Sequence, residues 1–472
     1  MTATAPPWQS DGRVPGYPST PSDQTAAPAK TWAVGTLVYT RAGLISLFGW
    51  LLWGDFALSL KDRSIPSVVQ LQLQKLAASD TLNGFLIGSL PAIIGLLVMP
   101  VIGYRSDRHR GPRGRRIPFL IGFTVIAVIS MLGLALSPQL GHGLDAALGA
   151  HSPGLTGCTL LSFSAAWTLF EFASIVLAGS LIGAFINDVV PHALLGRFYG
   201  LFRALSLIAG MAFNYWGFGE AENHANWIFV GMAVIYGVGF TVMCFKVKEG
   251  KYPPPPPVED RGHFLAPART YFKESFAQPY YWWVFASIMF TWMAFVPFTL
   301  YSVFYAKSVH MDMTTYGKLL ALTYLCSLVL AYPLGMLADK LHPLRVSAWL
   351  MVLYALATLG GGLFATNARG FAIALVVQGV LAGSWQTASA SLAQRLFPQS
   401  RFAQLASAMG IIGGVTGVGL PPLVGLILDH TGHEYRYTLL MNFGFSALAL
   451  FFTAVLYRKF RALGGPDHYV AP

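Results

Sequence analysis

Long apolar runs separated by short clusters of charge, Gly and Pro make up most of the 472-residue chain. Each run is long enough to cross a bilayer as a helix, which takes about 20 residues. A helix is the expected form because lipid leaves no partner for exposed backbone polar groups. Twelve such helices are expected, beginning near Ala42, Leu82, Ile117, Leu160, Phe198, Trp227, Trp282, Tyr316, Val346, Phe371, Phe402 and Leu439. The pattern predicts an all-α membrane protein.

A polar segment divides the twelve runs into six and six. It holds a run of five prolines at 253–257 and several charges, which is typical of a solvated, extended linker. The N-terminal residues are rich in Pro, Ser, Thr and Ala and predict a disordered tail. We expect a tail over 1–40, a six-helix bundle over 41–245, a linker over 246–280, a second bundle over 281–458 and a tail over 459–472.

Composition agrees with a membrane protein, because only 11% of the residues are charged and 54% are hydrophobic. A soluble domain carries about a quarter charged residues, so a soluble enzyme is excluded. The net charge of +11 is explained by an excess of basic residues on one side of the membrane. In the expected topology, 24 of the 31 Lys and Arg residues fall on the side of the termini and 7 on the other side. The positive-inside rule then predicts cytoplasmic termini, in a bacterial inner membrane or a plasma membrane, and the charge requires no nucleic acid.

The sequence lacks the motifs of several other kinds of chemistry. There is no GxxxxGKS phosphate loop and no HExxH or CxxC spacing, so no cofactor and no metal site is expected. The apolar runs make the lipid bilayer the expected surroundings of the chain.

Two loops at equivalent places in the two halves carry the same motif. GYRSDRHRGPRGRR runs from Gly103 to Arg116, and GMLADKLHPLR runs from Gly335 to Arg345; both contain GxxxD followed by a basic residue. A second pair, GRFYGLFRA from Gly196 and SRFAQLASA from Ser400, opens the fifth and eleventh helices. An internal repeat of six helices is one of the plans of secondary transporters.

These motifs resemble those of the major facilitator superfamily. The form GYRSDR followed by GRRIPFL, with INDVVPHALLGR from Ile186, is similar to the sucrose-type and glycoside-pentoside-hexuronide cation symporters. The resemblance implies a two-bundle transporter that works by alternating access, through proton-coupled symport of a sugar or glycoside. The expected partners are then a sugar-like small-molecule substrate and a proton, with the protein as a monomer. GYRSD also occurs in bacteriochlorophyll-delivery transporters, so a pigment delivery or assembly factor is an alternative, as is a receptor that does not transport.

The resemblance also implies that the first repeated loop locks a cytoplasmic gate. Asp107 would lie at the start of the eleventh helix, where the helix dipole favours an anion. Arg108, Arg115 and Arg116 would reach Asp188, and these bonds would form only while the cytoplasmic ends are together; otherwise the arginines are topogenic charge alone. Arg203 is expected to pair with Asp188, with Glu171 or substrate as alternatives. The remaining candidate gating residues are Gly103, Arg197, Gly335, Asp339 and Lys340.

Two acids, Asp55 and Glu171, fall well inside apolar runs. A charge at the bilayer centre costs about 2.5 to 3.5 kcal/mol, so such an acid normally faces a polar cavity or takes up a proton. Glu171 has mostly apolar neighbours in sequence and is the first candidate for proton coupling; a structural hydrogen bond and a cavity wall are the alternatives.

Asp55 is a candidate for substrate contact as well as for proton coupling. Trp50 and Trp53 precede it, and a carboxylate beside indole rings suits a sugar, whose hydroxyls bond the acid while its apolar faces stack on the rings. The charges that follow, Lys61, Asp62 and Arg63, line the outer half of a pathway if the first helix continues through Pro66. They form a solvated mouth if the helix ends at Leu60.

Polar side chains on the later helices are further substrate-binding candidates. Gln378, Trp385 and Gln386 are seven and eight residues apart and therefore share a helix face. Two amides and an indole on one face suit a polyhydroxylated ligand, and bonds between helices are the alternative. Asn214, Trp292 and Tyr301 are candidates of the same kind.

Overall fold

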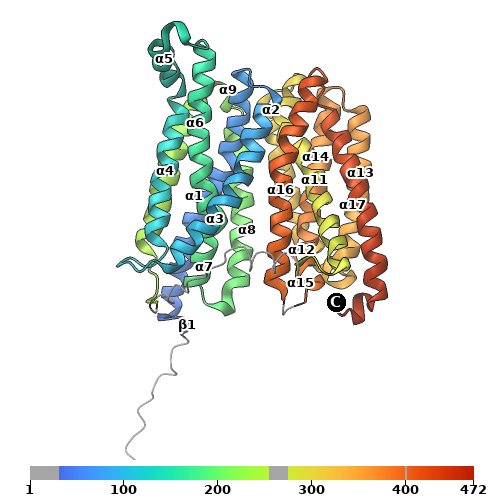
Figure 1. Ribbon diagram of the computed structural model, residues 1–472. Coiled ribbons are helices and arrows are strands. Elements are labelled where there is room, and N and C mark those ends of the chain that lie inside the picture. Colours follow the sequence, from blue (N-terminus) through green and yellow to red (C-terminus); the bar gives the residue numbers. More distant parts are fainter. Residues whose placement is uncertain (1–30, 253, 255–274, 399–400) are drawn as a thin grey trace, which may run out of the picture.

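A computed structural model of the chain describes residues 31–252, 254, 275–398 and 401–472 (Figure 1). In this part of the chain, twelve helical segments are long and apolar enough to cross a membrane. They begin within a few residues of the expected positions, so the predicted pattern of helices is confirmed.

The first half contains a short hairpin and six spans. Its elements are β1 (Trp32–Val34), β2 (Leu37–Tyr39), α1 (Arg41–Lys75), α2 (Asp80–Asn83), η1 (Gly84–Ser89), α3 (Leu90–Arg108), α4 (Ile117–Ala135), α5 (Ser137–Leu148), η2 (Gly149–His151), α6 (Leu155–Val176), η3 (Leu177–Leu181), α7 (Ile182–Val189), η4 (His192–Leu194), α8 (Leu195–Ala212), η5 (Phe213–Gly217) and α9 (Ala221–Lys246). Short π-helical turns join α2 to α3 and α6 to α7, and each set crosses as one span.

The second half contains the other six spans and two short helices. Its elements are α11 (Pro279–Ser308), α12 (Met313–Leu341), α13 (Pro343–Phe364), α14 (Ala368–Ala388), α15 (Leu392–Leu396), α16 (Phe402–His430), α17 (Tyr437–Ala462) and α18 (Gly465–His468).

The two halves lie side by side as separate bundles, blue to green and yellow to red in Figure 1. The hairpin and the C-terminus lie at the same end of the bundles, as an even number of spans requires. We call this end the terminal end and the opposite end, where α5 lies, the distal end.

The first helix runs unbroken for 35 residues from Arg41 to Lys75, with Pro66 inside it. Thr40 caps its start by accepting a hydrogen bond from the Gly43 backbone N–H. The alternative that the helix ends at Leu60 is therefore wrong, and Lys61, Asp62 and Arg63 belong to the spanning helix.

The two predicted tails contain more structure than expected. Residues 32–39 of the tail predicted over 1–40 form an antiparallel hairpin that pairs Trp32 with Tyr39, while residues 1–30 lie outside the described part. Beyond residue 458, α17 continues to Ala462, and the Tyr469 hydroxyl donates to the Leu396 carbonyl over 2.8 Å. Most of the linker predicted over 246–280 lies outside the described residues, between α9 and α11.

The two halves are held together at the distal end by a carboxylate that caps a helix of the other half. Asp429, at the end of α16, accepts hydrogen bonds from the backbone N–H groups of Asp80 and Thr81 over 2.9 and 3.0 Å, and from the Thr81 hydroxyl over 2.6 Å. These N–H groups lie at the start of α2 and have no partner inside their own helix.

Asp80 binds three further side chains of the second half. Tyr301 donates to its carbonyl over 2.7 Å, Tyr435 donates to its carboxylate over 3.1 Å, and His433 Nδ1 lies 2.7 Å from the same carboxylate. We call Asp80, Thr81, Tyr301, Asp429, His433 and Tyr435 the distal seal.

Glycine allows the helices of the distal seal to approach closely. A Cβ on Gly84 would lie 2.4 Å from the Pro421 carbonyl oxygen and 2.6 Å from the Tyr301 hydroxyl. A Cβ on Gly425 would lie 2.4 Å from the Asp80 carbonyl oxygen. No side chain fits at either position without separating the two halves.

We expect Gly84→Val to hold the distal end open, because its side chain would occupy the space of Pro421 and Tyr301. The measurement is the labelling rate of Leu300→Cys by a membrane-impermeant maleimide, after replacement of Cys158, Cys244 and Cys326. Gly84→Val should raise the rate several-fold. Gly95→Val is the matched control, since a Cβ there meets nothing closer than 3.7 Å. Equal rates in the two variants would show that the distal seal does not depend on this contact.

Candidate functional site

A cavity of about 580 Å³ lies between the two halves. Its walls come from α1 and α8 of the first half and from α11, α12 and α14 of the second half. Its polar lining residues are Arg63, Tyr199, Arg203, Ser206, Thr299, Ser302, Thr323, Tyr324, Ser327, Gln378 and Gln386. We call it the central cavity; its volume lies within the range of small-molecule sites, about 300 to 1,000 Å³.

A second cavity of about 350 Å³ adjoins the central cavity and shares Arg203 and Gln386 with it. It extends past the end of α14 to Ser389. The rings of Trp292 and Trp385 line it and meet edge to face, with centroids 6.2 Å apart. The two cavities together follow α14 towards the terminal end.

The predicted face of the tenth helix is present. Gln378 and Gln386 line the central cavity, and Trp385 and Gln386 line the second cavity. The Gln378 amide also donates to the Tyr354 hydroxyl over 3.0 Å, which is the bond between helices considered as the alternative. Gln378 therefore has both a cavity position and a structural partner.

The structure places Trp50 and Trp53 away from the central cavity, contrary to prediction. Trp50 lies under the Lys246 ammonium, 5.7 Å from its ring centroid, and Trp53 lies against Gly239. Both contacts are with α9. At roughly 100° of rotation per residue, Trp50 and Arg63 point to different sides of α1, so only one of them can face the cavity.

Asn214 and Tyr301 do not line the central cavity, also contrary to prediction. The buried Asn214 side-chain amide donates to the Gly210 carbonyl of its own helical segment over 2.7 Å, and the Asn214 backbone carbonyl lies where a Cβ of Gly317 would be only 2.3 Å away. Tyr301 belongs to the distal seal.

The three consecutive charges of α1 separate, because neighbouring residues on a helix point in different directions. Arg63 lines the central cavity, as the pathway interpretation requires. Lys61 instead turns into the first bundle and is fully buried. Its ammonium donates to the Asp62 carboxylate and to the Ser174 hydroxyl. It also lies 4.8 Å from the ring centroid of Phe170 and 5.2 Å from that of Tyr236.

Glu171 lies beside this buried lysine. It is one helical turn from Ser174 on α6, and its side chain is nearly inaccessible. The charges of Lys61 and Asp62 both act on it, although Glu171 has no charged neighbour in sequence. No residue of the described ranges donates a hydrogen bond to its carboxylate, so the structural hydrogen bond considered for Glu171 is not formed. We call Lys61, Asp62, Glu171 and Ser174 the buried charge cluster.

Asp55 is also buried, one turn before Ser59. The Ser59 hydroxyl donates to Asp55 Oδ1 over 3.2 Å, and Oδ2 has no partner among the described residues. Asp55 does not line either of the two cavities in this conformation, contrary to its predicted position at the substrate site.

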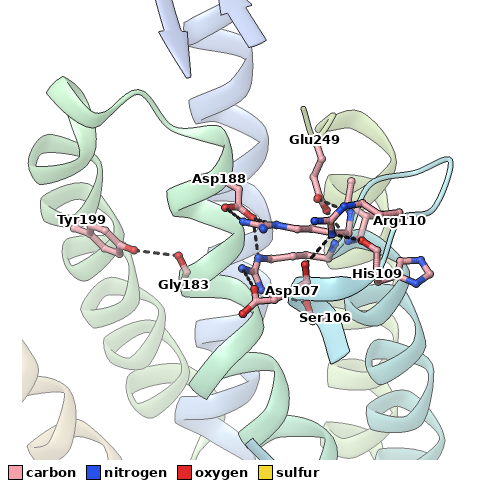
Figure 2. Close-up of polar contacts among 11 residues, drawn as sticks. Ser106, Asp107, His109, Arg110, Gly183, Asp188, Tyr199 and Glu249 are labelled. Atoms are coloured by element: carbon pink, nitrogen blue, oxygen red, sulfur yellow. Dashed lines mark hydrogen bonds and ion pairs between the residues drawn. The ribbon is translucent and has the colours of Figure 1, made fainter. Parts of the chain in front are cut away.

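The first repeated loop forms a network of ion pairs at the terminal end (Figure 2). Arg115 binds Asp188 through two nitrogens, over 3.0 and 2.5 Å, and Arg116 binds the same carboxylate over 2.7 Å. Arg116 also binds Asp107 over 2.6 Å. Burial lowers the pKa of Arg115, but the hydrogen bonds and the negative charge of Asp188 outweigh it and raise the pKa above its ordinary value.

All of these pairs lie within the first half, which corrects the predicted gate. Bonds between residues of one rigid half need not break when the halves rock, and they are formed here while the distal end is closed. Asp107 pairs with Arg116 and not with the start of the eleventh helix among the described residues. Arg203 contacts Thr387 of the second half over 3.4 Å, and the predicted Arg203–Asp188 pair is absent from the described contacts.

The facing helices of the two halves diverge towards the terminal end. A Cβ on Gly414 would lie 2.6 Å from Leu96, so α3 and α16 touch at that level. Gly103, nearer the terminal end of α3, has no atom within 4 Å of its Cβ position, and Figure 1 shows the terminal ends of α3 and α16 apart. The two halves therefore meet at the distal end and are spread at this terminal interface.

Glu249, which the sequence interpretation did not select, organises the same loop. Its carboxylate accepts hydrogen bonds from the backbone N–H groups of Arg115, Arg116 and Ile117 over 2.8, 2.8 and 2.7 Å. It thereby caps α4 from the segment that follows α9, at the end where the dipole favours an anion. Tyr252 supports Arg115, whose guanidinium lies 4.2 Å from its ring centroid. A lone acid among Lys246, Lys248 and Lys251 was the available signal.

The second repeated loop forms a simpler pair. Asp339 binds Arg395 of α15 over 2.6 Å, while Lys340 is exposed and Gly335 has open space around it. His342 is buried beside this pair; burial, followed by the charges of Arg395 and Arg345, lowers its pKa to about 4, so it is uncharged at neutral pH.

The last two candidate gating residues lie near the first loop. Arg108 lies with its guanidinium 5.1 Å from the Tyr104 ring centroid. Arg197 is exposed near the start of α8.

Two six-helix bundles around a polar cavity define the class as a multi-pass membrane transporter. The chain belongs to the Major Facilitator Superfamily, whose model matches residues 31–314 and 295–467. This finding confirms the major facilitator fold and the superfamily resemblance.

Solved structures of low sequence identity share the fold. An inward-facing bacterial homologue of the iron transporter ferroportin has a TM-score of 0.61 at 16% identity, over 88% of this chain and 99% of that one. A D-xylose-proton symporter has a TM-score of 0.56 at 16% identity, over 88% and 96%.

Two curated relatives align over part of the chain. The human proton-associated sugar transporter A is 27% identical over 268 residues, which are 52% of this chain and 33% of the relative. The mouse membrane-associated transporter protein is 29% identical over 161 residues, 33% of this chain and 27% of the relative. The alignments thus span a third or less of each relative's length.

We expect Glu249→Gln to destabilise the protein by about 1–3 kcal/mol, because one acceptor oxygen becomes an NH2 group that faces a backbone donor. The measurement is the melting temperature in detergent. Glu220→Gln, at a largely exposed position of the same half, is the control and should leave it unchanged. Equal melting temperatures of the two variants would contradict the capping role of Glu249.

Proposed function

We propose that the protein is a proton-coupled symporter for a sugar or glycoside, of the sucrose-type and glycoside-pentoside-hexuronide kind, that works by alternating access. The observation that carries this proposal is the buried charge cluster, which holds an acid beside a lysine inside the first bundle. Lys61 and Asp62 directly precede Arg63, which lines the central cavity. A change of charge in the buried charge cluster therefore acts on the same stretch of α1 that lines the central cavity.

Glu171 carries the proton in this proposal. When it is ionised, the Lys61 ammonium serves two carboxylates, those of Glu171 and Asp62. When Glu171 is protonated, Lys61 pairs with Asp62 alone and the cluster loses one buried negative charge. Moving a buried charge through a low-dielectric interior is costly, so the protonated and ionised states favour different arrangements of the halves. Asp55, one turn from Ser59, is the second candidate for the proton.

The distal seal at one end and the first repeated loop at the other act as alternating gates. Opening the distal end requires Asp429 to leave the start of α2 and exposes the central cavity to that side. Closing the terminal end brings α3 to α16, where Asp107 meets the N-terminus of α16 and Gly103 allows close approach. The Arg115 and Arg116 pairs with Asp188 keep the first half rigid during the motion. Arg108, Arg197, Asp339 and Lys340, with Gly335, complete the gate in this proposal.

The orientation in the membrane is proposed from the distribution of basic residues, and the coupling ion and substrate are supported by the relatives. The excess of Lys and Arg on the side of the termini supports a cytoplasmic terminal end, in a plasma membrane or a bacterial inner membrane. The protein acts as a monomer without a cofactor. The name of the human relative, proton-associated sugar transporter A, and the D-xylose-proton symporter among the fold neighbours support both the proton and the sugar. Co-purified pigment without transport would instead favour the pigment-delivery alternative, and binding without exchange would favour a receptor.

We expect Glu171→Gln to abolish proton-driven accumulation in proteoliposomes and to retain exchange, because the cluster can no longer gain or lose a proton. Uptake driven by an acid-outside pH gradient and counterflow at equal pH, over a panel of mono- and disaccharides, measure the two activities. Glu220→Gln is the matched control and should accumulate substrate like the unsubstituted protein. Normal accumulation by Glu171→Gln would remove Glu171 from the coupling role.

A further inference from the structure

The central cavity is lined by two arginines and by no acid. Arg63 comes from α1 and Arg203 from α8, and its other lining residues include no Asp and no Glu. The two guanidiniums are close enough to repel one another. A neutral sugar would leave this positive charge uncompensated.

The protein groups that touch these arginines are neutral. Arg63 donates to the Ser206 hydroxyl over 3.3 Å and lies 5.4 Å from the Tyr324 ring centroid. Arg203 donates to the Thr387 hydroxyl over 3.4 Å. Neither guanidinium lies within 4.0 Å of a carboxylate in the described ranges. Hydroxyls and rings orient a guanidinium but do not neutralise it.

The carboxylates that could neutralise Arg63 and Arg203 have other partners. Asp62 takes the Lys61 ammonium, and Asp188 takes Arg115 and Arg116. Asp55 accepts from Ser59 and influences Arg63 only at longer range. Asp188 is therefore not a free partner for Arg203, because its carboxylate already pairs with Arg115 and Arg116.

Alternating access makes the unpaired charge matter. In the structure described here, water reaching the cavity can solvate both guanidiniums. In an occluded state that water is largely excluded, and an unpaired arginine at membrane depth is then unfavourable. A ligand that brings a negative group removes this cost, and arginine binds carboxylate and phosphate oxygens through two parallel hydrogen bonds.

On the basis of the function proposed above, we propose that the substrate is a hydroxylated organic anion whose acid group binds between Arg63 and Arg203. Its hydroxyls face Gln378, Gln386 and Thr323 on the opposite wall. A six-carbon sugar acid or sugar phosphate fits a cavity of about 580 Å³. The anion also explains why a polar cavity suited to a sugar carries two positive charges.

Matched probes test this assignment in proteoliposomes of the full chain. D-Gluconate and sorbitol have the same six-carbon chain and differ in charge, and D-glucose 6-phosphate and D-glucose form a second pair. Counterflow of each labelled probe and its thermal-shift binding in detergent are measured at one pH. We expect at least one anion to bind and exchange about tenfold or more faster than its neutral partner, and the two anions distinguish a carboxylate from a phosphate substrate.

Arginine variants link the preference to the site. Arg63→Gln and Arg203→Gln should each raise the half-saturating anion concentration about 10- to 100-fold, the range for a charged hydrogen-bonded partner. Arg203→Lys should restore part of the loss, because it keeps the charge without the paired geometry. Arg369→Gln, at an exposed position of α14, is the control and should leave the concentration unchanged.

The outcomes separate this proposal from the proposed function. Exchange of sorbitol or glucose as fast as the anions, or anion exchange unaffected by the Arg63 and Arg203 variants, would overturn the anion assignment and leave transport standing. Anion binding that depends on the arginines, without exchange, would support the assignment and contradict transport. Neither binding nor exchange of any probe would overturn the assignment.

Discussion

A carboxylate of one half that caps a helix of the other half determines the state of this transporter. Asp429 takes the free N–H groups at the start of α2, and Tyr301, His433 and Tyr435 bind the same residue, Asp80. Gly84 and Gly425 let the backbones meet there. Because this end is held closed, the facing helices can separate at the other end, and the central cavity lies between them.

The second constraint is the handling of charge inside the bundles. The first bundle buries one lysine between Asp62 and Ser174, with Glu171 beside it, while the residue that follows, Arg63, turns to the cavity. One stretch of α1 therefore joins a compensated cluster to an uncompensated site. In the function proposed above, this arrangement links a proton inside the first bundle to an anion between the halves without any direct contact between them.

The sequence predicted the number of helices and the Asp188 pairs because apolar length and repeated motifs are local signals. It did not predict which side of α1 faces the cavity. In a membrane helix both the lipid-facing and the packed sides are apolar, so periodicity does not distinguish them. Trp50 and Trp53 were therefore assigned to the site, whereas they pack on α9. The capping of α4 by Glu249 depends on a contact over more than 130 residues of sequence, which no local pattern contains.

The central claim is that the two ends open in alternation. Electron–electron distance measurements in nanodiscs test it directly, with spin labels on Asn223→Cys and Thr366→Cys at the distal end and on His192→Cys and Lys340→Cys at the terminal end. All four positions are solvent-exposed or lie on loops and helix ends outside the distal seal. Adding protons and gluconate should populate a longer distal distance together with a shorter terminal distance. Unchanged distances at both ends, or distances that lengthen together, would contradict alternating access.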